Sequence, residues 1–154
     1  MPASGYSLRA ATAKDIWPIR WLVLSAWLDP TQLRWSQFWV AEAEGKVIAC
    51  GQLRQFEGAQ ELGSLVVARV WRGQGIGRRL TQQLINVALS MPGDSLPLYV
   101  ECLGHALKRF YKKLGFIPVT VTDMPPAMQR KFSFTASVAA RLRLPLYQMQ
   151  YCAP

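Results

Sequence analysis

The sequence predicts an α/β or α+β domain with a mixed central sheet flanked by helices. In its first half, apolar stretches at 38–42 and 46–56 flank Ala43-Glu44-Gly45, which is a hairpin signature. In its second half, apolar runs of strand length alternate with segments of helical period. At 154 residues the chain has the size of one domain, so we expect a single domain over residues 1–154.

The expected elements follow the hydrophobic pattern from the N-terminus. A strand at 6–9 precedes a helix at about 13–24, for which Thr12 is the expected N-cap, with Asp15 three residues on. A loop or short helix at 27–35 leads into the hairpin. The sequence then predicts a strand at 61–67, a helix from 76 to near Pro92-Gly93, a strand at 96–102, a helix stopped by Gly115, a strand at 116–121, a weakly helical run to about Leu142 and a strand at 146–151.

A glycine-rich turn, Arg72-Gly73-Gln74-Gly75-Ile76-Gly77, joins the strand at 61–67 to the following helix. Such a turn directs unpaired backbone N–H groups and the positive end of the helix dipole at one point, which suits phosphate. A dinucleotide fingerprint and a P-loop both fail here, because Arg78 stands where each needs a glycine. The turn therefore indicates a different phosphate ligand or a simple tight turn.

The spacing R-x-x-G-x-G, as Arg72, Gly75 and Gly77, resembles the acetyl-CoA signature of the GNAT acetyltransferases. A second block, Leu98-Tyr-Val-Glu-Cys102 followed by Phe110-Tyr-Lys-Lys-Leu-Gly-Phe116, is similar to the strand and helix that follow that signature in the family. The resemblance covers roughly residues 7–119 and is strongest at 61–116, while 122–145 is longer than a minimal family hairpin. It implies a GNAT-like sheet in which the strand ending at Val67 splays from the strand at 98–102, leaving a cleft for acetyl-CoA.

The resemblance implies acetyl-CoA as co-substrate, and the pattern of Cys and His residues separately leads us to expect no metal. Backbone groups of Val66, Val67 and Ala68 would bind the pantetheine arm, and the turn would bind the pyrophosphate. The implied turn residues are Arg72, Gly73, Gln74, Gly75, Ile76, Gly77 and Arg78. Gly104 and Leu107 stand where the family often has Asn and Ala, and this departure leaves a non-catalytic CoA-binding or sensing module as an alternative.

Direct acetyl transfer in a ternary complex needs a neutral amine, yet an alkylammonium has a pKa of about 10.4. A general base and a general acid on opposite sides of the thioester are therefore expected. Glu61 stands where many family members carry the base; Glu101 is the second choice, since a carboxylate on a central strand is costly to bury unpaired. Tyr111 matches the family tyrosine that lies near the thioester sulfur and serves as acid or hydrogen-bond donor. A solvated strand end for Glu61 and a core position for Tyr111 remain the structural alternatives.

The net charge of +9 favours anionic partners. The basic residues are scattered and no nucleic-acid-binding motif is present, so we expect no nucleic-acid partner. Three separated cysteines and one histidine, His105, predict neither a zinc site nor a disulfide framework. No apolar run approaches the roughly 20 residues that span a bilayer, so we expect a cytoplasmic protein with no membrane partner. The acceptor amine stays open among a protein N-terminus, a lysine and a small molecule, and a homodimer is possible.

Overall fold

The structure, a computed structural model, describes residues 5–91, 93 and 96–153. Its strands form a seven-stranded mixed sheet in the order β1-β2-β3-β4-β5-β7-β6, with helices on its faces, which confirms the predicted fold class. The chain divides into two compact units, Met1–Leu53 with Gly63–Ser90 and Arg54–Leu62 with Met91–Pro154. β3 (Lys46–Phe56) and β4 (Ala59–Val67) each contribute residues to both units.

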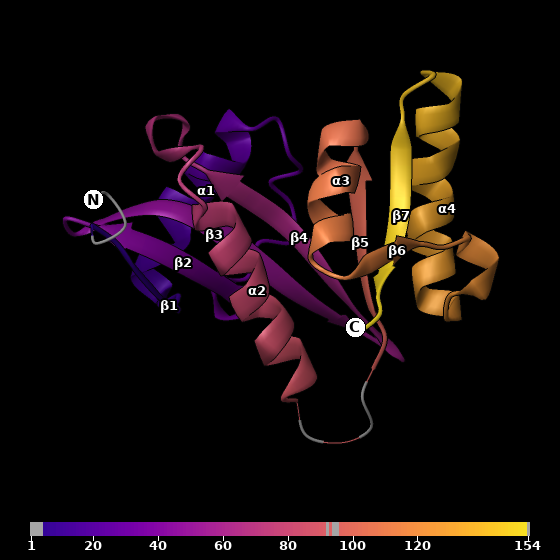
Figure 1. Cartoon of the computed structure of the whole chain (residues 1–154), viewed down its shortest axis with the longest axis horizontal. Helices are drawn as coiled ribbons and strands as arrows, with labels where there is room; N and C mark the ends of the chain where they lie inside the picture. The colour runs from indigo at the N-terminus through magenta and orange to yellow at the C-terminus, as the bar shows by residue number, and fades with distance from the viewer. Residues whose placement is uncertain (1–4, 92, 94–95, 154) are drawn as a thin grey trace. The chain divides into compact units, whose positions relative to one another are not determined.

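The first unit holds an antiparallel sheet of β1 (Ser7–Ala10), β2 (Phe38–Ala43) and β3 (Figure 1). The predicted hairpin is confirmed, because β2 and β3 pair from Phe38↔Gln52 to Ala43↔Lys46. Its turn has positive φ at Glu44 and Gly45, 51° and 75°, which matches the right-handed twist of the flanking strands.

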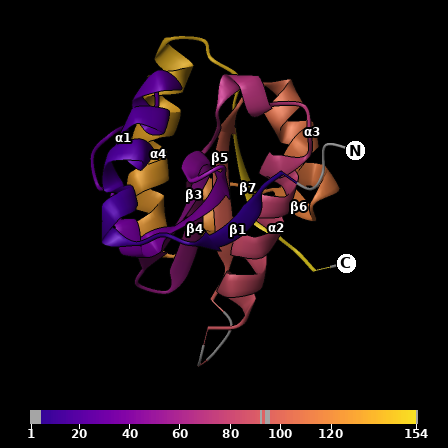
Figure 2. The ribbon, with the colours of Figure 1, turned by 90° about the vertical axis from the view of Figure 1, so that its left-hand side faces the viewer.

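Two helices cover opposite faces of this sheet (Figure 2). α1 (Ile16–Ser25) follows a 3-10 turn at Ala13–Asp15, and the predicted capping box is present, with the Thr12 N–H donating to Asp15 Oδ2 at 2.7 Å. α2 (Ile76–Leu89) follows the glycine turn; Pro92, near which its end was predicted, lies outside the described residues. The α1 side buries Ile19, Leu22, Val23, Phe38, Val40, Cys50 and Val66, and the α2 side buries Ala41, Ala43, Ile48, Ala49, Ile76 and Leu80.

The strands of the second unit mix parallel and antiparallel pairing. Gln60–Leu62 of β4 run parallel to Leu98–Val100 of β5 (Leu98–Leu103), and β7 (Leu146–Tyr151) lies antiparallel between β5 and β6 (Phe116–Pro118). The strand predicted at 116–121 was too long. It stops at Pro118, which has no N–H to donate, and the chain passes into a 3-10 turn at Val121–Asp123.

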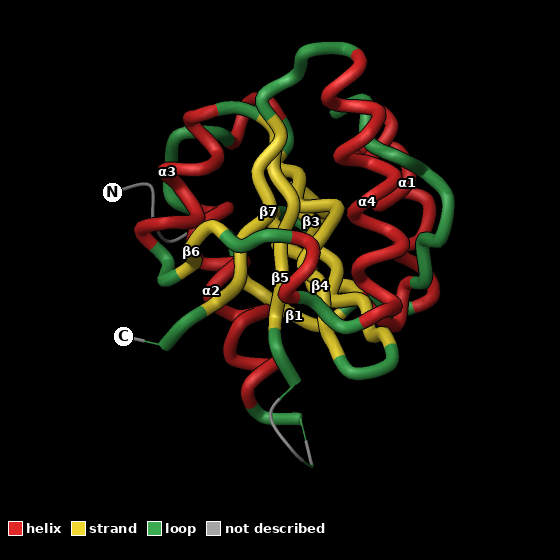
Figure 3. The backbone as a smooth tube through the Cα atoms, turned by 90° about the vertical axis from the view of Figure 1, so that its right-hand side faces the viewer, coloured by secondary structure: helices red, strands yellow, loops and turns green. Residues whose placement is uncertain are grey.

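α3 (His105–Lys113) and α4 (Pro126–Arg141) cover opposite faces of the strands of the second unit (Figure 3). α4 replaces the weakly helical run predicted within 122–145 with sixteen helical residues, beginning with a proline at a position where no N–H partner is needed. The helix α4 forms because tertiary packing outweighs the modest helix propensity of its sequence. Met128 and Phe132 are fully buried with Tyr99 of β5.

Candidate active site

The glycine turn in the first unit presents a run of unpaired backbone donors. Among the described residues, no hydrogen-bond partner is present for the N–H groups from Gly73 to Arg78, and the first helical bond runs from Arg79 N–H to Gly75 O at 3.1 Å. Gly73 and Gly75 have φ of 79° and 81°, and a Cβ built on either would meet no atom within 4 Å. These N–H groups therefore open onto free space at the positive end of a fourteen-residue helix, which fits a phosphate group.

The arginines around this turn have different roles. Arg72 donates from Nε to Val67 O at 2.9 Å and so joins the turn to the end of β4. Arg79 contacts Tyr6, donating to its hydroxyl at 3.0 Å, whereas Arg78 is exposed and makes no such contact among the described residues. The first turn of α2 contains no acidic residue, so its charge suits an anion.

The segment Val66, Val67 and Ala68, predicted to bind the pantetheine arm, uses some of its backbone groups internally. Ala68 N–H donates to Ile48 O at 2.8 Å, and Val67 O accepts from Arg72. Just before it, Ser64 has a φ of 49°, which is uncommon for a residue with a side chain and interrupts the regular extension of β4. The predicted cleft beside Val67 involves residues of both units and stays a prediction.

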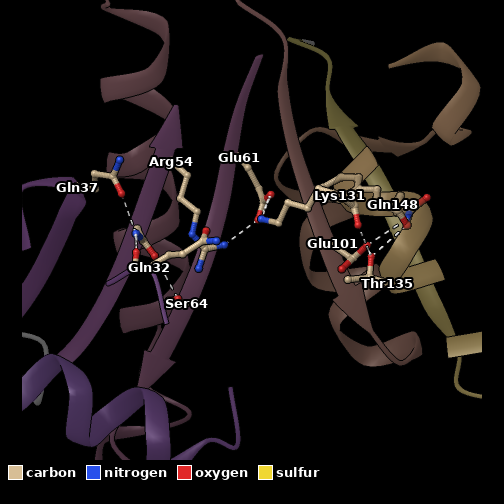
Figure 4. A network of polar contacts seen from close by, with 11 residues as sticks. Gln32, Gln37, Arg54, Glu61, Ser64, Glu101, Lys131, Thr135 and Gln148 are labelled. Carbon is tan, nitrogen blue, oxygen red and sulfur yellow. Dashed lines mark hydrogen bonds and ion pairs between the residues drawn. The ribbon is translucent and has the colours of Figure 1, made fainter. Parts of the chain in front are cut away.

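Glu61, the predicted base, lies buried in the second unit with two cations on its carboxylate (Figure 4). Arg54 of β3 donates to Oε1 at 2.8 Å, and Lys131 of α4 donates to Oε1 at 2.6 Å and also to Oε2. Neither cation was identified from the sequence. Arg54 precedes Glu61 by seven positions on the neighbouring strand, and Lys131 follows it by 70. The solvated strand end considered as an alternative is wrong for this residue, which is 4% exposed.

Glu101 of β5 has neutral hydrogen-bond donors in place of cations. Thr135 Oγ1 donates to its Oε2 at 2.6 Å, and Gln148 Nε2 donates to the same oxygen at 3.1 Å (Figure 4). Burial raises the pKa of this carboxyl above its ordinary value, although the two donors act in the opposite direction. The sequence carried one signal for this contact: Thr135 and Lys131 lie four residues apart and share one face of α4.

Tyr111 of α3 is buried, and its ring packs edge-to-face on Phe116 at 5.5 Å between centroids. Its hydroxyl has no hydrogen-bond partner within the described part of the chain, and it is not a fully buried atom. Burial raises the pKa of Tyr111, with a smaller contribution from Cys102, so the hydroxyl is protonated at neutral pH. Tyr111 is therefore both a packed aromatic residue and an unsatisfied O–H donor.

The acid and base candidates of the second unit lie on opposite faces of its sheet. Glu101 bonds to Thr135 on α4, whereas the next residue of β5, Cys102, faces α3 and Tyr111. Successive strand residues point to opposite faces, so this separation follows from the strand itself.

Gly104 and Leu107 are the two positions that differ from the usual family residues. Gly104 caps α3 with a φ of 95° and donates its N–H to Pro145 O at 2.8 Å. Leu107 is 43% exposed. His105, the only histidine, has Nδ1 2.8 Å from the Tyr147 hydroxyl. In residues 5–91, 93 and 96–153, no group of three His, Cys, Asp or Glu side chains is placed to hold a metal ion.

Comparison with known proteins identifies the domain. Residues 34–118, which include the glycine turn and Tyr111, match the family described as acetyltransferase (GNAT) domain. The chain belongs to the GNAT family. The predicted family and its acyl-CoA-dependent acetyltransferase domain are thereby confirmed. No helix in the part of the chain that the structure describes is long and apolar enough to cross a bilayer.

Curated GNAT relatives are named for N-acetyl transfer. N-acetylaspartate synthetase of Xenopus tropicalis is 31% identical over 121 residues, covering 76% of this chain and 42% of that protein. The probable N-acetyltransferase camello of Xenopus tropicalis is 29% identical, covering 65% of this chain and 47% of that protein. The chain thus spans less than half the length of these relatives.

Solved structures share the GNAT fold at low sequence identity. N-acetylglutamate synthase from Neisseria gonorrhoeae, complexed with coenzyme A and N-acetylglutamate, superposes with a TM-score of 0.75 at 18% identity over 95% of this chain and 34% of that chain. Rv2747 from Mycobacterium tuberculosis, in complex with CoA, has a TM-score of 0.75 at 22% identity over 96% of this chain and 99% of its own. These two likenesses support the fold alone.

Proposed function

We propose that this chain transfers the acetyl group of acetyl-CoA directly to a primary amine in a ternary complex. The observation that carries the proposal is the run of unpaired N–H groups from Gly73 to Arg78, at the start of a helix and beside two glycines of positive φ. This turn suits the pyrophosphate of acetyl-CoA, which supplies the acetyl group as a thioester. Val66, Val67 and Ala68, at the end of β4, are proposed to bind the pantetheine arm through their remaining backbone groups.

We propose Glu101 as the base that deprotonates the amine, in preference to Glu61. Both oxygens of Glu61 already accept hydrogen bonds from cationic side chains. Glu101 has neutral donors on one oxygen and a pKa raised by burial, which makes its carboxylate a better proton acceptor at neutral pH. In this proposal Glu61 holds the side chains of Lys131 and Arg54 in position. The alternative is that Glu61 is the base and takes the proton of the amine through a water molecule.

We propose Tyr111 as the acid. The departing thiolate needs a proton or a hydrogen bond, and the hydroxyl of Tyr111 is an O–H donor that no described residue uses. Its pKa is raised, so the proton is present when the C–S bond breaks. The ring is held by Phe110 and Phe116, at centroid distances of 5.1 and 5.5 Å, which fixes the direction of the hydroxyl.

The acceptor we propose is an amino acid with an acidic side chain. One curated relative, an N-acetylaspartate synthetase, is named for an acetylated acidic amino acid. The second unit also carries two partly accessible cations beside Glu61, since the Arg54 and Lys131 side chains are 15% and 29% exposed. Such cations suit the carboxylates of that substrate.

An acceptor screen tests the proposal. The purified chain is mixed with acetyl-CoA and single amines, including aspartate, glutamate, lysine, a polyamine and an N-terminal peptide, and released thiol and product mass are recorded. Thiol release that depends on aspartate or glutamate, with a product heavier by one acetyl group, is the expected result. Release with another amine would retain the activity and reject the acceptor class. Tight CoA binding without release across the panel would support the sensing module instead.

A further inference from the structure

α1 is apolar on both of its faces. Its inner face buries Ile19, Leu22 and Val23 against the sheet of the first unit. Its outer face carries Trp17 and Trp21, which are 71% and 74% exposed, and Leu24, which is 53% exposed. A helix that is apolar all round is normally covered on all sides, so the outer face of α1 needs a partner to cover it.

The three outer residues form one continuous stripe. They stand at positions i, i+4 and i+7, which places them along a single side of the helix. Trp27, directly after the helix, is 96% exposed, in a loop where the sequence also allowed a short helix. We call Trp17, Trp21 and Leu24 the tryptophan face. Isolated exposed apolar residues are ordinary, but two tryptophans aligned on one helix indicate an interaction surface.

The charges next to the tryptophan face are positive. The Arg20 guanidinium lies 5.0 Å from the centre of the Trp17 ring, and Lys14, two residues before α1, is exposed. α1 contains no acidic residue, and Asp15, just before it, is buried with both carboxylate oxygens bound to Arg9. The nearest exposed acid along the chain is Asp29, which accepts hydrogen bonds from Thr31.

We propose that the tryptophan face of α1 binds the surface of an anionic lipid bilayer. Tryptophan rings concentrate at the boundary between headgroups and acyl chains, and neighbouring Arg and Lys side chains pair with lipid phosphates. A second copy of the chain fits less well, since pairing α1 with itself would bring Arg20 and its neighbours close to like charges in a chain of net charge +9. The sequence led us to expect no membrane partner because no segment spans a bilayer, but a helix lying on the surface needs no spanning segment.

Vesicle co-sedimentation tests this proposal independently of acetyl transfer. Vesicles of phosphatidylcholine and phosphatidylglycerol in equal parts should sediment the full chain, and pure phosphatidylcholine should sediment it much less. Trp17→Ala with Trp21→Ala should weaken binding by about tenfold or more, because the anchoring rings are lost. Arg20→Gln should weaken it by about fivefold at low salt, and high salt should remove that difference.

Two matched variants serve as controls. Phe134→Ala removes a ring that is also 71% exposed, on α4, and Arg130→Gln removes an exposed cation of the same helix. Both should sediment like the wild type. The proposal is overturned if the wild type does not bind anionic vesicles, or if the double tryptophan variant binds them equally well. It is also overturned if the wild type forms dimers that this variant abolishes while vesicle binding is absent, because the face then joins two copies of the chain.

Discussion

At the level of single residues, the two buried carboxylates of the second unit differ in what surrounds them. Glu61 is bound by Arg54 and Lys131, whereas Glu101 accepts from Thr135 and Gln148. Burial raises the pKa of the Glu101 carboxyl above its ordinary value. Two carboxylates in one unit can thus have separate roles, one as base and one in positioning.

The pH dependence of two variants distinguishes these roles. The base must be deprotonated to act, so wild-type turnover should rise with pH through the raised pKa of Glu101. Glu101→Gln should lose roughly 10²-fold in kcat at neutral pH, and the loss should narrow at higher pH, where more of the acceptor amine is already neutral. Glu61→Gln should give a loss of similar size at every pH. A loss that narrows with pH only in Glu61→Gln would assign the base to Glu61.

The Tyr111 hydroxyl should act only in turnover. Tyr111→Phe keeps the ring contacts with Phe110 and Phe116, so we expect a stable protein with unchanged acetyl-CoA affinity and a kcat lower by about 10²-fold. Tyr151→Phe is the matched control, because Tyr151 also packs on Phe116 at 5.5 Å. Equal activity of both variants, with chemistry limiting the rate, would leave Tyr111 as a core residue only.

At the level of elements, we propose that the glycine turn and α2 act together as an anion site. The donors are free because the first turn of a helix has no carbonyls before it to pair with, and the positive φ at Gly73 and Gly75 lets the chain reverse direction there. Neither property depends on distant parts of the chain. The site is therefore a local consequence of the order of strand, glycines and helix.

Gly75→Val should weaken acetyl-CoA binding severely, by about 10²-fold or more, because a branched side chain fills the space in front of the donors. Gly45→Val is a matched control: Gly45 has a φ of 75°, close to the 81° of Gly75, and both positions are open. Each variant should lose about 1–2 kcal/mol of stability from the unfavourable backbone conformation. Titration calorimetry on the folded variants should show weakened binding for Gly75→Val only. Equal affinities would reject the cofactor site.

At the level of the whole molecule, the net charge of +9 comes from cations that lie at different sites and suit different anionic partners. Arg78 lies at the glycine turn, while Arg20 lies beside the exposed Trp17 ring on α1. Overall charge thus indicates anionic partners without selecting one. The selection depends on which backbone donors or aromatic rings stand next to each cation.

The sequence by itself determined the family and the hairpin, and it predicted the glycine turn as the phosphate site and Tyr111 as the acid. All of these rest on short-range patterns, since glycine spacing and hydrophobic period act within one or two elements. The outer face of α1 was hidden in the same pattern, because a helix apolar on both sides gives no indication of which residues stay exposed.

Only the tertiary structure decided the surroundings of the two carboxylates. Lys131 and Thr135 reach Glu61 and Glu101 from a helix that the sequence showed only as weakly helical, across separations of 70 and 34 positions. A buried charge is stable only when a partner satisfies it, and nothing in the local sequence says which distant side chain that will be. The residues around the proposed base therefore became visible when α4 was seen packed against β5.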